Sequence, residues 1–186
     1  MQGTRTDRRK RIIFLSVAIV ILALTIFLDQ WTKKYFSNYV KENGNITVID
    51  GFFYITHVVN TGAAWSFLSN VTWGQLLFKI MTPIAIIAFS FFYVLAFKKN
   101  YKWLQISIVF IIGGTIGNYI DRLVASGVID FISFVFGEYR FPVFNLADCF
   151  LVVGVIMVFV HYLFLDNNAI FKKKDAKKDV SDNPEQ

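Results

Sequence analysis

Cysteine and histidine are scarce in this chain of 186 residues. Its single cysteine, Cys149, excludes an internal disulfide and leaves no pair of thiols at the spacing of a zinc site. The two histidines, His57 and His161, give little support for a serine or cysteine nucleophile, because no hydroxyl or thiol is spaced to pair with them. We interpret Cys149 as a small packed residue and His161 as a tolerated helix residue. No internal repeat is visible.

Hydrophobic residues, in contrast, are abundant. They make up 55% of the chain, and the mean hydropathy is +0.52. The 21 phenylalanines and 4 tryptophans suit contact with lipid better than a small soluble core. The formal net charge of +6 is not by itself a nucleic-acid footprint, because the position of the charges matters more than their sum. The composition predicts a one-domain membrane protein with no nucleic-acid partner.

Four apolar segments are each near the roughly 20 residues that cross a hydrocarbon core of about 30 Å. Pro83, in the second segment, is tolerable as a kink in a membrane helix. The predicted fold class is an all-α membrane protein with four transmembrane helices, at about residues 12–31, 75–97, 103–122 and 146–165.

The first of these segments has an alternative interpretation. A basic tail at residues 1–11 precedes the apolar run Ile12–Leu28, and this order is also typical of a secretory signal peptide. The run is long for a signal peptide, however, and no convincing small-x-small cleavage site precedes the sequence Asp29–Lys33. We therefore interpret it as the first membrane span.

The connection between the first two spans, residues 32–72, has a different composition. Tyr35–Asn43 is polar and aromatic, which favours a short interfacial helix. Ile46–Val59 is rich in β-branched and aromatic residues and contains the turn signal Asp50-Gly51. We expect two or three short strands here, outside the bilayer core.

The basic residues predict the orientation in the membrane. With four spans, both termini and the loop at residues 98–102 share one side, and that side holds 13 of the 19 lysines and arginines. The positive-inside rule places this side in the cytoplasm. We therefore expect a cytoplasmic basic tail at 1–11, a single membrane domain at 12–166 and a charged, disordered cytoplasmic tail at 167–186.

This topology brings polar residues to one depth. Spans one and three end, and span four begins, at the same outer boundary of the membrane. Ionisable residues near membrane depth are candidates for a functional site, because an unpaired charge there is costly. The residues predicted to converge are Asp29, Asn60, Asn118, Asp121, Arg122, Asp130, Asn145 and Asp148.

Two of these carboxylates, Asp130 and Asp148, lie 18 positions apart and are sufficient for hydrolysis if the segment between them folds back. Two facing carboxylates cannot both ionise, so they share one proton. The ionised member then takes a proton from water while the protonated member donates to the carbonyl oxygen or the leaving amine. Structural roles remain open, since an aspartate at a helix end is often a cap. Asn118 and Asn145 either satisfy backbone groups or orient the aspartates.

Other polar or small residues have plain structural interpretations too. Gly113 and Gly117 form a G-x-x-x-G spacing, which in a membrane helix usually means close helix packing. Here it could let span three approach span four. Asp121 and Arg122 form either part of the site or only an interfacial ion pair, and Asp29 either contributes or only anchors span one.

Five segments give the chain a specific resemblance, and they occur in order across nearly all of it. They are Asp29-Gln30-Trp31-Thr32-Lys33, Asn60-Thr61-Gly62-Ala63-Ala64-Trp65, Gly114–Arg122, Val128-Ile129-Asp130-Phe131 and Phe141–Asp148. Through them the chain resembles the lipoprotein signal peptidases (signal peptidase II), membrane aspartic peptidases of bacteria. The resemblance implies that Asp130 and Asp148 are catalytic. It implies supporting or substrate-binding roles for Asp29, Lys33, Asn60, Gly62, Asn118, Asp121, Arg122 and Asn145.

The resemblance also implies a reaction and its partners. The enzyme would lie in the bacterial inner membrane, with its site on the extracytoplasmic side and a small extracytoplasmic β-sheet or cradle between the first two spans. It would remove the signal peptide of a prolipoprotein just before the diacylglyceryl-modified cysteine. No metal or cofactor is expected, and the partners are lipid-modified prolipoproteins, membrane lipids and inhibitors of the globomycin type, bound by a monomer. Cys149 departs from the small or hydroxyl residue expected after the second aspartate, and the basic tails are extensions without a family role.

Two rival classes of function remain in view. A small proton-coupled transporter also uses membrane carboxylates, but near the midplane and often with repeat symmetry. A structural membrane adaptor would use the polar residues as anchors, and gives no reason for five ordered motifs. A bell-shaped pH profile of peptide cleavage would distinguish a carboxylate pair from both.

Overall fold

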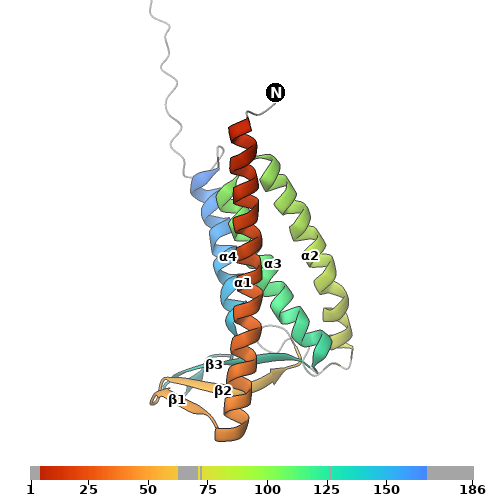
Figure 1. The fold of residues 1–186 in the computed structure, drawn as a ribbon. Coiled ribbons are helices and arrows are strands. Elements are labelled where there is room, and N and C mark those ends of the chain that lie inside the picture. Colours follow the sequence, from red (N-terminus) through yellow and green to blue (C-terminus); the bar gives the residue numbers. More distant parts are fainter. Residues whose placement is uncertain (1–4, 63–70, 72, 126, 167–186) are drawn as a thin grey trace, which may run out of the picture.

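A computed structural model describes residues 5–62, 71, 73–125 and 127–166 of the chain. The residues at 63–65 of the second motif and the tail at 167–186 lie outside this described part. Four helices run side by side and a small β-sheet lies across the end of the bundle that is remote from the N terminus (Figure 1). The helices are α1 (Arg5–Asn43), α2 (Gly74–Lys98), α3 (Lys102–Val124) and α4 (Leu146–Val160), which continues as the π-helical turn η2 (His161–Leu165).

All four helices are long and apolar enough to cross a membrane, which confirms the prediction of four spans. Helix α3 is the most buried of them, and it packs against α1, α2 and α4. Its contact with α2 is an apolar cluster of Ala96 on α2 with Leu104, Ile108 and Ile112 on α3. The apolar faces of the other helices remain exposed, as expected where lipid takes the place of a protein core.

Helix α1 is longer than the sequence predicts. Residues Tyr35–Asn43, expected as a separate interfacial helix, continue α1 without a break, and the helix also begins within the basic tail, at Arg5. At 1.5 Å per residue, its 39 residues reach about 58 Å, roughly twice the thickness of a hydrocarbon core. The separate helix is therefore wrong, because no glycine or proline interrupts α1 before Gly44, where a φ of 81° ends it.

The sheet combines two distant parts of the chain. Its strands are β1 (Ile46–Ile49), β2 (Phe53–Asn60), β3 (Val128–Phe136) and β4 (Tyr139–Arg140), paired antiparallel in the order β1-β2-β3-β4. The turn at Asp50-Gly51 is confirmed, with a φ of 71° at Gly51. The prediction was wrong to place the sheet wholly between the first two spans, and an all-α class is too narrow, because half of the sheet comes from the α3–α4 connection.

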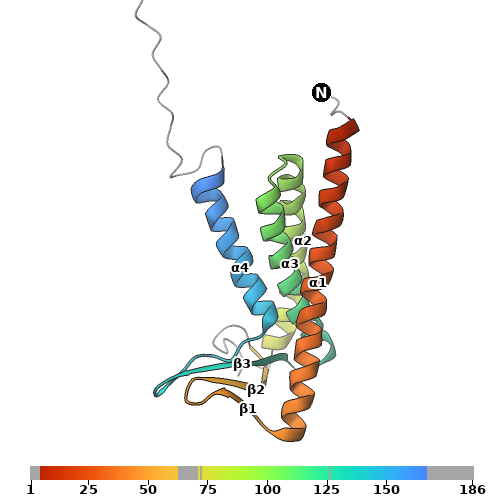
Figure 2. The ribbon, with the colours of Figure 1, turned by 60° about the vertical axis from the view of Figure 1, so that its left-hand side comes forward.

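The end of α1 holds the sheet against the bundle. Val40 of α1 packs with Ile55 of β2 and Phe131 of β3, and Phe36 of α1 stacks on Phe131 with 5.1 Å between the ring centroids. Figure 2 shows the sheet crossing below the helices, with the lower part of α1 running past it. This cluster fixes β3, and with it Asp130, beside the ends of α1 and α3.

Glycines set the spacing between the helices. A Cβ added to Gly113 would lie 2.6 Å from Thr25 of α1, and one added to Gly117 would collide with Asp29 of α1. The G-x-x-x-G pair therefore packs mainly on α1 rather than on α4. The close approach of α3 to α4 instead uses Gly114, which lies against Ala147, and Gly154, where a Cβ would meet a backbone oxygen of α3 at 2.7 Å.

Candidate active site

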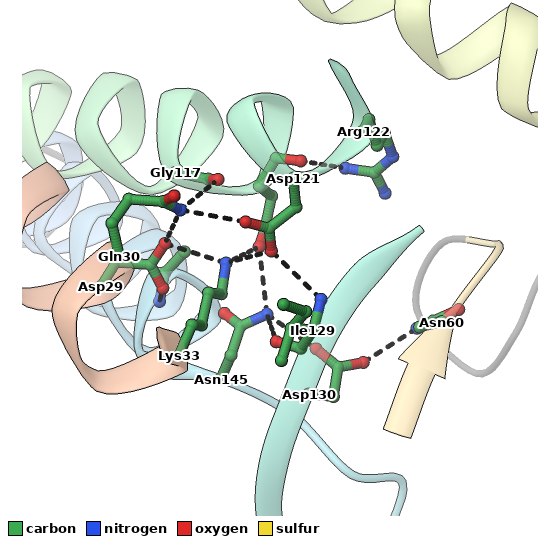
Figure 3. Close-up of polar contacts among 12 residues, drawn as sticks. Asp29, Gln30, Lys33, Asn60, Gly117, Asp121, Arg122, Ile129, Asp130 and Asn145 are labelled. Atoms are coloured by element: carbon green, nitrogen blue, oxygen red, sulfur yellow. Dashed lines mark hydrogen bonds and ion pairs between the residues drawn. The ribbon is translucent and has the colours of Figure 1, made fainter. Parts of the chain in front are cut away.

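A buried ammonium group lies where α1 meets α3. The Nζ atom of Lys33 lies 2.8 Å from Asp29 Oδ2 and 2.9 Å from Asp121 Oδ2, and it donates to Asn118 Oδ1 at 2.9 Å. Lys33 is only 1% exposed and Asp29 is fully buried. Figure 3 shows Lys33 reaching up from α1 between the two carboxylates. All three protons of the ammonium thus have acceptors, which offsets the cost of removing this charge from water.

Gln30 completes the link between α1 and α3. Its side-chain nitrogen lies 3.1 Å from Asp29 Oδ2, 3.0 Å from the Gly117 carbonyl oxygen and 3.0 Å from Asp121 Oδ1 (Figure 3). The sequence alone predicts neither a site role for Gln30 nor the role of the Gly117 carbonyl oxygen as a hydrogen-bond acceptor. A polar amide directly after Asp29, at the end of an apolar helix, was the available signal.

The two carboxylates that pair with Lys33, Asp29 and Asp121, each also accept a hydrogen bond from a backbone N–H outside their own helix. Asp29 Oδ1 accepts from Ala147 N at 2.9 Å, and Asp121 Oδ2 accepts from Ile129 N at 3.1 Å. Ala147 directly precedes Asp148, and Ile129 directly precedes Asp130. The ion cluster therefore fixes the backbone immediately before both candidate catalytic residues.

Asp148 lies in the first turn of α4, where the helix is capped. Asn145 is the N-cap: its side-chain oxygen accepts from Asp148 N at 3.0 Å, and Asp148 Oδ2 accepts from Asn145 N at 3.2 Å. This reciprocal pair is a capping box, and the partial positive charge of the helix N-terminus favours a carboxylate there. Asn118 Nδ2 donates to the other oxygen, Asp148 Oδ1, at 2.8 Å. Asp148 thus takes part in capping α4, and its side chain also accepts a hydrogen bond from Asn118 on α3.

Asp130 lies on β3, where it is 3% exposed. Asn145 Nδ2 donates to its Oδ1 at 2.7 Å, and Asn60 Nδ2 on β2 donates to its Oδ2 at 3.1 Å (Figure 3). The β2–β3 pairing places Val58 opposite Asp130 and Asn60 opposite Val128, so the sheet register brings Asn60 within reach. Asn145 therefore contacts both aspartates, through its side chain to Asp130 and through its backbone to Asp148.

The carboxyl group of Asp130 is in an unusual electrostatic environment. Burial, followed by the charge of Asp148, raises the pKa of Asp130 from 3.8 to about 7. The hydrogen bonds from Asn60 and Asn145 and the charge of Lys33 act in the opposite direction but are outweighed. A carboxyl group with such a pKa can hold a proton at physiological pH and donate it during a reaction.

Arg122 borders the site on the side of α2. Its guanidinium donates to the carbonyl oxygens of Asn118 and Gly62, each at 3.2 Å, and lies 5.1 Å from the ring centre of Phe78. Gly62 N in turn donates to Asn60 Oδ1 at 2.9 Å. Within the described residues Asp121 pairs with Lys33, and no ion pair joins it to Arg122. The structure therefore brings together all ten residues named as site candidates.

The two histidines and the cysteine make no described hydrogen bond to the carboxylates of the site. His161 sits at the far end of α4, with its ring 4.9 Å from that of Tyr101. No hydrogen bond in the described part of the chain joins His57, on β2, to the site, and burial lowers the pKa of its imidazole. Cys149 is half-buried beside Asp148. No group of three metal-ligating side chains occurs among the described residues.

The raised pKa of Asp130 predicts a pH-dependent stability. Its folded-state value of about 7 exceeds the unfolded value of 3.8, so its stabilising contribution is complete below about pH 4 and is lost as the pH rises through about 7. The upper bound of this loss is about 4 kcal/mol. We expect the melting temperature of the wild type, relative to Asp130→Asn, to fall by several degrees between about pH 5 and about pH 8. Thermal unfolding in detergent at both pH values measures this. An equal difference at both would contradict the raised pKa.

Comparison with known proteins finds one family. A sequence model of the family described as signal peptidase (SPase) II matches residues 19–164. A lipoprotein signal peptidase of Bacillus pumilus is 40% identical over 144 residues, which cover 77% of this chain and 90% of that protein. One of Geobacillus kaustophilus is also 40% identical, over 77% of this chain and 91% of that protein.

Solved structures give the same picture. A structure described as a bacterial membrane enzyme, obtained by the in meso method at 1.9 Å resolution, is 33% identical with a TM-score of 0.68. The match covers 82% of this chain and 96% of that one. A second such structure, at 2.3 Å resolution, is 32% identical with a TM-score of 0.63, over 79% of this chain and 87% of that one.

Proposed function

The chain belongs to the signal peptidase II family, and from this membership and the site described above we propose that it is an aspartic endopeptidase of the cell membrane that processes prolipoproteins. The family and its relatives support a membrane peptidase that acts on lipoproteins. Asp130 and Asp148 are proposed as its catalytic pair. The observation that carries this assignment is that Asn145 contacts both carboxylates at once, while each also accepts a second hydrogen bond from an asparagine.

The proposed reaction is the attack of a water molecule on the scissile peptide carbonyl. One carboxylate takes a proton from the attacking water, and the protonated carboxyl group donates its proton to the carbonyl oxygen, which gives a gem-diol. The proton taken from water then passes to the leaving amine, and the gem-diol returns a proton to the other carboxylate as the C–N bond breaks. The C–O bond forms and the C–N bond breaks with no covalent enzyme intermediate. Because Asp130 holds its proton up to about pH 7, it is suited to the role of acid. We expect kcat/KM to fall as the pH rises beyond that value.

The proposed substrate is the signal peptide of a prolipoprotein, cut just before its diacylglyceryl-modified cysteine. A membrane-spanning signal helix and two acyl chains can diffuse laterally to a site at the end of a helical bundle. The exposed apolar surfaces of the helices are compatible with acyl chains, whose burial stabilises by about 0.8 kcal/mol per CH₂ group. The supporting residues around the pair would hold the site in shape.

The proposed orientation places the site and the sheet on the extracytoplasmic side. The described basic residues at the start of α1 and in the α2–α3 connection lie at the end of the bundle opposite to the sheet (Figure 1). The positive-inside rule assigns that end to the cytoplasm. Both termini would then be cytoplasmic, and the exported substrate would meet the site from outside.

The transporter and adaptor alternatives have less support. The candidate site lies at one end of the bundle, beside the sheet, rather than midway along the helices as in a proton-coupled transporter (Figure 2). An adaptor would have no need of two carboxylates, one with a pKa of about 7, joined by a shared asparagine. Neither class is favoured by the matched family.

The experiment that tests this function is cleavage by the purified protein in detergent. The substrate is a prolipoprotein with the diacylglyceryl group on its cysteine, and the matched control is the same polypeptide without the lipid. We expect cleavage of the lipidated form at a rate at least about tenfold higher, with the modified cysteine as the new N-terminal residue by mass spectrometry. Equal cleavage of the two would overturn the lipid requirement. No cleavage of either would leave the transporter or the adaptor as the better interpretation.

A further inference from the structure

Lys33 does not contact either candidate catalytic carboxylate, yet it is connected to both. Its nearest acceptors are Asp29, Asp121 and the side-chain oxygen of Asn118. Figure 3 places it on the α1 side of the network, with Asp130 on the far side, nearer to Asn60. The sequence resemblance implies only an unspecified supporting role for Lys33. The contacts define that role more narrowly.

The first connection runs through the amide of Asn118. A side-chain amide can lie either way round, with its oxygen and nitrogen exchanged. Asn118 Oδ1 accepts from Lys33 Nζ at 2.9 Å and from Asn145 Nδ2 at 3.0 Å, and its Nδ2 therefore faces Asp148 Oδ1 at 2.8 Å. The opposite orientation would turn an amide N–H₂ toward an ammonium and an amide oxygen toward a carboxylate. The cation on α1, together with the Asn145 amide, thus determines that Asp148 receives a donor.

The second connection runs through the two carboxylates that Lys33 pairs. Asp29 binds the backbone N–H before Asp148, and Asp121 binds the backbone N–H before Asp130. Without Lys33 these two buried anions would lie close together without a cation, which is strongly destabilising because nothing compensates their lost hydration. One group therefore positions the backbone at both members of the pair.

The charges around Lys33 come from every element that packs there. Asp29 lies on its own helix, Asp121 and Arg122 on α3, Asp148 on α4 and Asp130 on β3. Asp148 lies in the first turn of α4 and accepts from the Asn118 amide, which Lys33 polarises. Asp130 is 3% exposed and lies on the sheet rather than in the first turn of a helix, so it is the better place for a proton.

We infer that Lys33 is the positioning residue of the aspartate pair: through the Asn118 amide it presents a hydrogen-bond donor to Asp148, so that the shared proton stays on Asp130. This inference rests on the proposed function. It assigns Asp148 as the group that activates water and Asp130 as the acid. It also explains why a lysine is buried in a site whose chemistry needs no cation.

The test uses a charge-balanced variant, Lys33→Met/Asp29→Asn. It keeps the net charge of the ion cluster, and the new amide oxygen at position 29 can still accept from Ala147 N, but the donor to Asn118 is lost. We expect kcat on the lipidated substrate to fall at least about tenfold while KM changes by less than about threefold. We also expect the acidic limb of the pH profile to move upward by about one unit or more, because Lys33 then no longer orients the donor that Asn118 presents to Asp148.

The matched control is Lys34→Met, the same substitution at the next residue, which is exposed. Its kinetics and pH profile should equal those of the wild type. If the double variant folds and keeps the wild-type kcat and pH profile, Lys33 has only a structural role and the inference is overturned.

The position of the shared proton, on Asp130 or on Asp148, can also be measured without substrate turnover and without a lysine variant. The infrared absorption of a protonated carboxyl group, measured on the wild type at about pH 6, should include a band that is lost above about pH 7. That band should be missing from Asp130→Asn. If Asp130→Asn retains it, the proton is on another carboxyl group and the inference is wrong. An inactive wild type would refute the proposed function, whereas this band assigns the proton in either case.

Discussion

Replacing either aspartate of the pair by asparagine should abolish turnover. We expect Asp130→Asn and Asp148→Asn each to lower kcat/KM on the lipidated substrate by at least about 1,000-fold, which corresponds to about 4 kcal/mol of transition-state stabilisation. The reason is that an amide can neither take a proton from water nor donate one as an acid. Substrate binding should remain, because the surrounding apolar surface and the asparagines are unchanged.

The control for this experiment is Glu138→Gln. It makes the same chemical change at an exposed carboxylate in the turn between β3 and β4, and it should keep full activity. Activity of the two aspartate variants is measured beside their melting temperatures and their extraction in detergent. Full activity in a folded Asp130→Asn or Asp148→Asn protein would remove that residue from the mechanism. A combined variant should be little worse than either single one, because the two residues act as a unit.

Widening the contact between α3 and α4 should have the largest effect on folding. A Cβ at Gly154 would lie 2.7 Å from both Ile111 Cγ1 and the Ser107 carbonyl oxygen. The oxygen belongs to the backbone of α3, so it cannot move aside as a side chain can. We expect Gly154→Leu to cost about 3 kcal/mol or more and to lower the melting temperature by many degrees. Activity should be lost with it, since Asn118 on α3 must reach Asp148 on α4.

Val155→Leu is the matched control for this substitution. Val155 is the next residue on α4 and is 42% exposed, so a larger side chain there meets open surface. We expect its melting temperature and activity to stay close to those of the wild type. If Gly154→Leu melts like Val155→Leu, the helices can separate without loss, and the close approach at Gly154 does not stabilise the fold.

The helices could be predicted from the sequence because burial in lipid demands a simple pattern. A span needs about 20 apolar residues whatever its neighbours are, and the four predicted segments correspond to four such helices. The Asp50-Gly51 turn is similarly local, since it depends on a positive φ that glycine supplies. The length of α1 is harder to predict. The polar residues after Asp29 indicate that the helix ends there, whereas helix propensity and packing on β2 and β3 continue it.

The third strand was the main omission. Val128–Phe136 is rich in β-branched and aromatic residues, which favours a strand. Its position between two membrane spans, however, is equally typical of an irregular connection. Its partner, β2, lies about 70 positions earlier in the chain, and Asn60 is 70 positions from Asp130. Pairing over such a distance depends on the tertiary structure, because no local pattern specifies which strands meet.

The sequence by itself determined the four spans, the charge asymmetry of the chain and the set of polar residues that the spans bring to one end. These follow from local composition and from the cost of placing charges in lipid. Only the tertiary structure decided how these residues connect: that Lys33 pairs Asp29 with Asp121, that Asn145 contacts both aspartates, and that β3 carries Asp130. Hydrogen bonds require atoms within about 3 Å, and sequence spacing alone cannot set distances between separate helices and strands.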